Sequence, residues 1–274
     1  SDKIFKILDL PEPQAGEKTL PDGALDVTLK DVHFSYEEDR EILKGIGLNL
    51  PAGSFVSLVG ESGCGKSTIA GILAAKNRGY NGEIIIGGVP LNEVNEINLM
   101  QRVVLVRHNS YLFKGTVEEN LKMAKPDATK EEMDAVLQKS NLLGFLQTQD
   151  GLQTQLLEKA SNLSGGQCQR LVIARALLRT DSAVYIFDEA ASNIDVESEE
   201  LIMNVIHELA KTKTVLLISH RLANVVKSDK IYFLKDGEIK ESGKHDELMS
   251  RNGAYRHLYE SQMALENYGK GGVA

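Results

Sequence analysis

The sequence contains no tryptophan and only two cysteines among its 274 residues. Cys64 and Cys168 lie far apart and lack the spacing of metal ligands, so we expect neither a disulfide framework nor a zinc site, and a reducing compartment is favoured. No apolar run approaches the roughly 18 residues that indicate a membrane-spanning helix, and the start of the chain shows no signal peptide. Because the first residue is Ser1 rather than Met, we expect a fragment of a longer protein.

Positive charge is also scarce. Lysine and arginine total 31 against 39 aspartates and glutamates, which gives a formal net charge of -8, and there is no long basic run. A nucleic-acid partner therefore receives no electrostatic support, and none is expected. With 42% hydrophobic and 26% charged residues, the composition is that of an ordinary globular protein with one large domain or two small ones.

Continuous apolar runs predict the core of an α/β fold. These runs show no alternation of apolar and polar residues, and helical patterns separate them along the chain. Both features are typical of a parallel sheet that is covered on both faces. The predicted strands are Ser54–Gly60, Val103–Val106, Ala183–Phe187 and Thr214–Ser219.

Other segments predict antiparallel strands and helices. The alternation over Val27–Phe34 predicts an exposed edge strand, and GEIIIGGVPL predicts a hairpin with a Gly-Gly turn. IYFLKDGEIKESG predicts a hairpin that turns at Lys235–Gly237. Between about residues 109 and 179 the pattern is helical, and Thr129 with Glu132 predicts a capping box at one helix start.

The stretch GESGCGKST, from Gly60 to Thr68, fits the pattern G-x-x-x-x-G-K-[ST] between an apolar strand and a helical segment. Its glycines let backbone N–H groups surround phosphate oxygens, and the helix N-terminus favours their negative charge. We expect Lys66 to reach the β- and γ-phosphates of a nucleotide and Ser67 to supply a hydroxyl to Mg²⁺. The alternative is a chance glycine-rich turn, which the strand–helix context disfavours.

Two further predicted strands end in residues with catalytic chemistry. Asp188 and Glu189 follow Ala183–Phe187, and His220 follows Thr214–Ser219. Ligands of open α/β sheets bind at the carboxyl ends of strands. An Asp there can hold Mg²⁺ through water, the next carboxylate can polarise an attacking water, and an imidazole can hydrogen-bond the γ-phosphate. Taken singly, the carboxylates could instead cap the next helix, and the histidine could be an ordinary surface residue.

A second glycine motif occurs in LSGGQCQRLVIARALL, from Leu163 to Leu178. Ser164, Gly165 and Gly166 come at the start of a predicted helix, where exposed amides and a hydroxyl form a second anion site. Two phosphate-binding sites on different parts of one chain suggest that two chains enclose the nucleotide between them. The alternative is a simple N-cap and loop.

With these motifs together, the sequence resembles the nucleotide-binding domain of ABC transporters over about residues 25 to 250. Gly60–Ser67 resembles the Walker A loop, Ala183–Glu189 resembles Walker B with its catalytic glutamate, and Leu163–Gln167 is an unaltered ABC signature. His220 falls at the position of the switch histidine. The stretches YLFKGTVEENL and EKASNLSGGQ are similar to exporters, and the leading KIFKILDLPEP resembles the connector after the last transmembrane helix of a half-transporter.

The resemblance implies a P-loop NTPase core with a mostly parallel sheet, an antiparallel β subdomain and an inserted α-helical subdomain. Residues 1–24 would connect to an upstream membrane domain, with a short amphipathic helix over Ile4–Leu10, and residues 25–250 would form the ATP-binding domain. Within that domain, residues 25–107 and 180–250 would form the RecA-like core together with the β subdomain, and residues 108–179 would form the helical subdomain. Residues 251–274, after the domain, would form a C-terminal helix and a flexible tail.

The implied activity is Mg²⁺-dependent ATP hydrolysis that powers export across a membrane. Two such domains would pair head to tail around ATP, as a homodimer or a heterodimer, at the cytoplasmic face of the cell membrane. The implied catalytic residues are Glu189, His220 and Lys66, and the implied metal ligands are Ser67, Asp188 and His108. The implied nucleotide contacts are Tyr36, which would stack on adenine, together with Gly60, Glu61, Ser62, Gly63, Cys64, Gly65, Lys66, Ser67, Thr68, His108, Ser164, Gly165, Gly166 and Gln167.

Two loops depart from the family pattern. His108 stands where the family has the Q-loop glutamine, and Ala191 and Asn193 differ from the usual D-loop, in which Asp195 would contact the partner. In one interpretation His108 replaces the glutamine as a sensor with a pH-dependent charge. In the other interpretation the chain is one half of a heterodimer with one altered site. Departures in two loops favour this second interpretation.

Three other classes of protein compete with an exporter. A soluble ABC ATPase of DNA maintenance or translation usually carries a long coiled-coil insertion or two such domains, and neither is present in the sequence. An ABC importer subunit has its own Met and no preceding connector. A domain that binds ATP without hydrolysing it conflicts with Glu189 and the unaltered signature.

Overall fold

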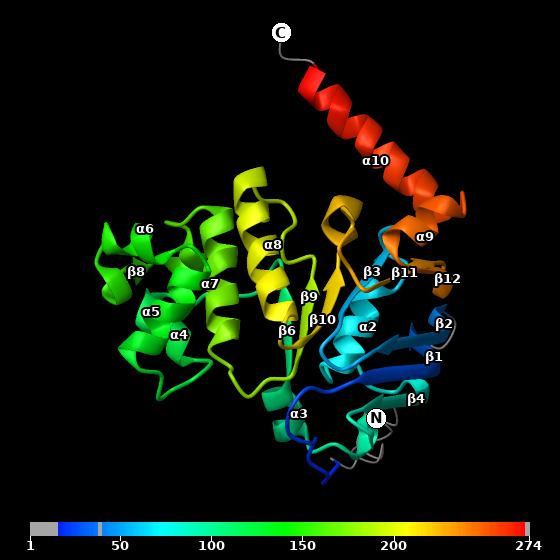
Figure 1. Cartoon of the computed structure of the whole chain (residues 1–274). Helices are drawn as coiled ribbons and strands as arrows, with labels where there is room; N and C mark the ends of the chain where they lie inside the picture. Colours follow the sequence, from blue (N-terminus) through cyan, green and yellow to red (C-terminus); the bar gives the residue numbers. More distant parts are fainter. Residues whose placement is uncertain (1–15, 38–39, 272–274) are drawn as a thin grey trace, which may run out of the picture.

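A computed structural model describes residues 16–37 and 40–271 (Figure 1). The helix predicted over Ile4–Leu10 lies outside the described residues, as do residues 1–15 of the predicted connection at 1–24. Among the helices that the structure describes, none combines the length and hydrophobicity that crossing a membrane requires.

The centre of the fold is a six-stranded sheet. Neighbouring strands in its interior are parallel, and only the edge strand β12 runs antiparallel to β11. The predicted parallel sheet and the hairpin at its edge are therefore confirmed. In spatial order the strands are β12 (Glu238–Gly243), β11 (Lys230–Lys235), β3 (Phe55–Gly60), β10 (Thr214–Ile218), β9 (Val184–Asp188) and β6 (Val103–Arg107).

Both faces of this sheet are buried, which explains the continuous apolar runs. In β9, Tyr185 and Phe187 point into one hydrophobic cluster, whereas Val184 and Ile186 point into the other. Side chains of successive strand residues alternate between the two faces. Each residue of the strand therefore loses its contact with water, and all five of its positions are buried.

A second sheet is antiparallel and packs beside the first. Its spatial order is β2 (Arg40–Leu50), β1 (Val27–Glu37), β4 (Asn81–Ile86) and β5 (Val89–Pro90), so the predicted Gly-Gly hairpin is confirmed. The prediction of an edge strand over Val27–Phe34 is wrong, because β1 pairs with β2 on one side and with β4 on the other. Its alternating pattern reflects one buried and one more open face, which an interior strand of an antiparallel sheet can also have.

Four helices with two short strands form a lobe to one side of the parallel sheet, away from the antiparallel sheet (Figure 1). The lobe occupies most of the segment that the sequence predicts to be helical. Its elements are β7 (Gly115–Thr116), α4 (Val117–Lys122), α5 (Lys130–Lys139), α6 (Leu143–Gln147), β8 (Gln155–Leu156) and α7 (Gly165–Leu177), with the 3-10 turns η2 (Gly151–Gln153) and η3 (Glu158–Ala160).

The remaining helices lie closer to the two sheets, except α10, which extends beyond the body of the molecule toward the C-terminus (Figure 1). These helices are α2 (Lys66–Leu73), α3 (Glu96–Arg102), α8 (Val196–Ala210), α9 (His245–Ser250) and α10 (Ala254–Gly271), with the turns η1 (Leu91–Glu93) and η4 (Leu222–Val225).

The predicted capping box at the start of α5 is present. The Thr129 hydroxyl accepts a hydrogen bond from the Glu132 N–H at 3.2 Å, and the Glu132 carboxylate accepts one from the Thr129 N–H at 2.9 Å. We expect Thr129→Ala to lower the free energy of unfolding by about 1 kcal/mol, because one N–H at the helix start loses its partner. Urea denaturation measures this loss. Thr129→Ser, which keeps the hydroxyl, is the control, and an equal loss in both variants would contradict the capping role.

Candidate nucleotide-binding site

The predicted phosphate loop connects β3 to α2 at the carboxyl end of the parallel sheet. Gly60 ends the strand with a φ of 151°, and a Cβ atom at this position would lie 2.0 Å from the carbonyl oxygen of Leu234. Gly65 precedes the helix with a φ of 110°. Both positions require a glycine, because other residues rarely adopt such φ values. Between them Glu61, Ser62 and Gly63 form the exposed tip of the loop.

Lys66 reaches back across this loop from the first turn of α2. Its ammonium group donates hydrogen bonds to the carbonyl oxygens of Gly60 (2.9 Å) and Glu61 (2.7 Å), and its Nζ lies 3.6 Å from the Cys64 sulfur. The side chain is 4% exposed. A buried cation is thus fixed beside the backbone N–H groups of a helix N-terminus, and both features favour a phosphate group.

Ser67 and Asp188 join the phosphate loop to the end of β9. The Ser67 hydroxyl donates a hydrogen bond to Asp188 Oδ1 at 2.9 Å, and Arg107 Nε lies 3.5 Å from Asp188 Oδ2. Burial raises the pKa of Asp188, while the hydrogen bond from Ser67 and the charge of Arg107 act in the opposite direction. Arg107 is a neighbour that the sequence reasoning missed. Arg107 ends β6 and pairs in parallel register with Asp188, and no local sequence pattern marks this pairing.

The oxygen atoms of Ser67 and Asp188 fit a magnesium ion. Mg²⁺ prefers oxygen ligands, usually keeps several waters and takes one or two carboxylates together with substrate phosphates. A hydroxyl and a carboxylate 2.9 Å apart, next to a phosphate loop, form such a donor set. Imidazole nitrogen is better suited to zinc, copper or nickel. The chemistry of the donors therefore favours Ser67 and Asp188 over His108.

Glu189 and His220 face each other at the ends of adjacent strands. The Glu189 N–H donates to the carbonyl oxygen of Ile218 at 3.0 Å, and Glu189 has a φ of 53°. This left-handed conformation turns the chain directly after β9. His220 Nδ1 lies 4.0 Å from Glu189 Oε1, and the imidazole is 53% exposed. A carboxylate and an imidazole next to Asp188 can together orient a water molecule.

Tyr36 lies at the end of β1 with 61% of its surface exposed. Its hydroxyl lies 3.2 Å from Thr68 Oγ1 and accepts a hydrogen bond from Asn77 Nδ2 at 3.1 Å, while Phe34 contacts its ring edge-on. These contacts fix an exposed aromatic ring beside the first turn of α2. Such a ring can stack on a planar base. Asn77 is a further supporting residue that the sequence pattern did not reveal.

The signature motif forms the start of α7 in the helical lobe. Ser164 caps this helix with Gln167 in a capping box, and both Ser164 and Gly165 are exposed. Gly166 is buried against the start of α8, where a Cβ atom would lie 2.1 Å from Ser198 Oγ. Asp195 caps α8, and the hydrogen bonds from Ser198 lower its pKa. Among the contacts of the described residues, none joins Ser164 to the phosphate loop.

The segment after β6 connects the sheet to the helical lobe. Gln169 of α7 donates a hydrogen bond to the Arg107 carbonyl at 3.2 Å, and Arg175 donates to the Tyr111 carbonyl at 2.9 Å. His108 is exposed, and a positive charge on it would lower the pKa of Asp188. The structure thus brings His108 into the electrostatic surroundings of Asp188 while both ends of its loop are fixed to α7.

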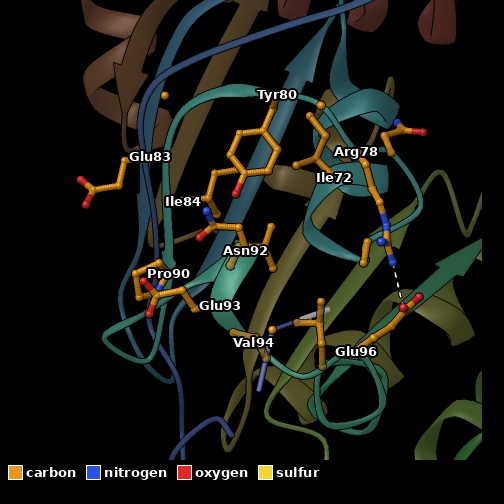
Figure 2. A pocket seen from close by; sticks show the side chains of 17 residues that line it. Ile72, Arg78, Tyr80, Glu83, Ile84, Pro90, Asn92, Glu93, Val94 and Glu96 are labelled. Carbon is orange, nitrogen blue, oxygen red and sulfur yellow. Dashed lines mark ion pairs between the residues drawn. The ribbon is translucent and has the colours of Figure 1, made fainter. Parts of the chain in front are cut away.

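A cavity of about 480 Å³ lies elsewhere, between the end of α2 and the hairpin of β4 and β5 (Figure 2). Ile72, Tyr80 and Leu91 line it, and an ion pair of 2.8 Å joins Arg78 to Glu96 at its side. None of the residues that the sequence predicts for the nucleotide site lines this cavity. Asn77, which donates a hydrogen bond to the Tyr36 hydroxyl, does line it, so the cavity adjoins the Tyr36 side of the site.

A phosphate loop joined to a strand-end aspartate on a mostly parallel sheet defines a P-loop nucleotide-binding protein. The family model described as "ABC transporter" matches residues 43–192. The chain belongs to the ABC transporter family.

Three known proteins illustrate what the chain is similar to. A Haemophilus influenzae protein named as an uncharacterized ABC transporter ATP-binding protein is 45% identical over 97% of this chain and 48% of its own length. An ATP-dependent lipid A-core flippase of Francisella tularensis is 39% identical over 95% of this chain and 43% of its own length. The structure of a bacterial Atm1-family ABC exporter with ATP bound superposes with a TM-score of 0.85 at 32% identity, over 95% of this chain and 46% of that one.

The chain spans about half the length of these curated relatives. The chain is an ABC-type ATP-binding domain similar to those of exporters, and the competing classes of soluble ATPase and importer subunit are not favoured by these relatives. The predicted fold class is also confirmed, because the sheet order and the solved relative agree with it.

Proposed function

We propose that this domain hydrolyses ATP with Mg²⁺ and that the hydrolysis drives export by a larger transporter. The contact of 2.9 Å between Ser67 and Asp188 carries the proposal, because it joins a phosphate loop to the carboxylate that would hold the metal ion. Bound Mg²⁺ would neutralise charge on the phosphates during transfer. Lys66 would bind the β- and γ-phosphates, while Glu189 would polarise the attacking water.

We propose further that the active unit contains two nucleotide-binding domains arranged head to tail. The exposed start of α7 offers backbone N–H groups and the Ser164 hydroxyl to an anion, yet its described contacts are with α8 rather than with the phosphate loop. Each ATP would therefore lie between the phosphate loop of one domain and Ser164–Gln167 of the other. ATP stabilises the closed pair, and hydrolysis releases it.

Mixing two inactive variants tests this arrangement. Lys66→Ala removes the phosphate-binding cation, and Gly165→Asp places a carboxylate where the phosphate of the partner domain would lie. Within the described part of the chain, a Cβ atom at Gly165 meets only the Ile194 side chain, at 3.9 Å, so the substitution fits the fold. Each variant alone has two defective sites per dimer, whereas a mixed dimer has one intact site. Random pairing in an equal mixture makes half of the dimers mixed, so about a quarter of the wild-type turnover returns.

The same assay distinguishes a partner that is a second copy of this chain from a partner that is a different nucleotide-binding domain. If the mixture stays inactive although each variant folds and the wild-type chain is active alone, the shared site is contradicted. If the wild-type chain binds ATP but neither dimerises nor hydrolyses it alone, a homodimer formed by this domain by itself is contradicted. A heterodimer then requires that a different nucleotide-binding domain restores hydrolysis when it is added. The test therefore also addresses the interpretation, favoured by the altered Q-loop and D-loop, that this chain is one half of a heterodimer.

We infer that the complete transporter has its membrane domain upstream of this chain, with the ATP-binding domain at the cytoplasmic face. The flippase and the Atm1-family exporter support this inference, since each extends well beyond the part that matches. Expression of the longer reading frame in membrane vesicles, with and without ATP, tests it. Absence of apolar spans upstream would contradict it.

His108 is proposed to give the site a pH-dependent charge. Histidine gains a positive charge on mild acidification, and this charge would oppose Mg²⁺ beside Asp188. We expect the KM for Mg²⁺ to rise more between pH 8 and pH 6 in the wild type than in His108→Gln, by roughly two- to fivefold, as for a charge interaction of up to about 1 kcal/mol.

Steady-state ATPase assays at fixed ionic strength measure this difference. His257→Gln, which changes an exposed histidine on α10, is the matched control and should retain the wild-type profile. Identical pH profiles in wild type and His108→Gln would refute the sensor role.

A further inference from the structure

The C-terminal helix α10 holds the loop that carries His220. The Gln262 side chain donates a hydrogen bond from Nε2 to the His220 carbonyl at 2.6 Å, and its Oε1 accepts one from the Leu222 N–H at 2.9 Å. A single amide thus binds the backbone on both sides of Arg221. A glutamine amide provides both a donor and an acceptor, so both of its hydrogen-bonding functions are used here.

Arg221 adds a second connection between the same elements. Its guanidinium forms an ion pair with Glu199 of α8 and another, at 2.8 Å, with Glu266 of α10. Glu199 is 5% exposed and also accepts a hydrogen bond from Asn224 at 2.7 Å. The loop after β10 is therefore held between α8 and α10, and α8 begins directly after the loop that follows Glu189.

The imidazole of His220 is half exposed, and its Nδ1 lies 4.0 Å from Glu189 Oε1. Its backbone carbonyl, by contrast, is fixed by Gln262. Small displacements of a catalytic group can lower rates strongly, because the reacting geometry must be held closely. Contacts that fix the His220 backbone therefore bear on the position of its side chain relative to Glu189.

We propose that Gln262 is a positioning residue for ATP hydrolysis and that α10 holds His220 in its working orientation. This inference rests on the proposed function, since it assumes that His220 takes part in hydrolysis. Gln262 does not contact the phosphate loop, Tyr36 or Asp188 among the described residues. Its loss should therefore slow the reaction without weakening the binding of ATP.

Steady-state kinetics on the full 274-residue chain test the proposal. If the chain hydrolyses ATP only together with a different nucleotide-binding domain, the same kinetics are measured on the complex of the two domains. We expect Gln262→Ala to lower kcat about tenfold, as for the misplacement of a catalytic group, with the KM for ATP unchanged. Ser261→Ala is the matched control on the same helix, because among residues 16–37 and 40–271 the Ser261 hydroxyl bonds only to the His257 carbonyl of α10. It should leave kcat unchanged, and thermal unfolding should show that both variants fold.

A double-mutant cycle with His220→Ala distinguishes positioning from general support of the fold. If Gln262 acts through His220, Gln262→Ala has no further effect on the residual turnover of His220→Ala. Equal losses in both backgrounds, or a change in KM instead of kcat, would overturn the proposal. If His220→Ala itself leaves turnover unchanged, the assumed role of His220 fails. If His220→Ala slows turnover but Gln262→Ala does not, only the positioning role fails.

Discussion

Glu189→Gln should abolish turnover while leaving the binding of ATP intact. The amide keeps the size of the side chain but cannot polarise water as a carboxylate does, and general-base catalysis contributes on the order of 10²–10⁴-fold to a rate. We therefore expect kcat to fall at least about 100-fold. In the proposed mechanism ATP stabilises the closed pair, and in this variant it is no longer consumed. The variant should therefore accumulate as an ATP-bound dimer, which size-exclusion chromatography with ATP and Mg²⁺ detects.

Glu200→Gln provides the matched control for this prediction. Glu200 lies exposed on α8, close in sequence to Glu189 but outside the site. It should retain wild-type turnover and show no trapped dimer. A Glu189→Gln variant that hydrolyses ATP at the normal rate and stays monomeric with ATP would refute both the role of Glu189 and the dimer mechanism.

Lys66→Ala should remove most of the affinity for ATP. Lys66 is the buried cation of the phosphate loop, and its two hydrogen bonds to loop carbonyls show that its ammonium group lies within the loop itself. We expect the Kd for ATP to rise about 100-fold, which corresponds to about 2.8 kcal/mol. The effect on adenosine, which has no phosphate, should be small.

Isothermal titration calorimetry measures both affinities. Lys76→Ala, which removes an exposed lysine just after the C-terminal end of α2, is the control and should bind ATP as the wild type does. If Lys66→Ala weakened ATP and adenosine equally, the loss would arise from damage to the fold rather than from the missing phosphate contact.

Much of this protein follows from local sequence. The phosphate loop needs glycines at fixed positions because of backbone sterics, as at Gly60, and a lysine for charge. These requirements lie within nine consecutive residues, so the motif is recognisable without a structure. Likewise, continuous apolar runs predict strands buried on both faces, and a threonine with a glutamate three residues later predicts a helix start.

Other features depend on segments that lie far apart in the chain, and only the tertiary structure decides them. The pattern of β1 indicates one open face but cannot show how many neighbours the strand has, so its interior place was missed. Arg107 approaches Asp188 because β6 and β9 are adjacent in parallel register. Gln262 reaches His220 across 42 residues of sequence. No local pattern marks such contacts, because they arise from the packing of whole elements rather than from the preferences of neighbouring residues.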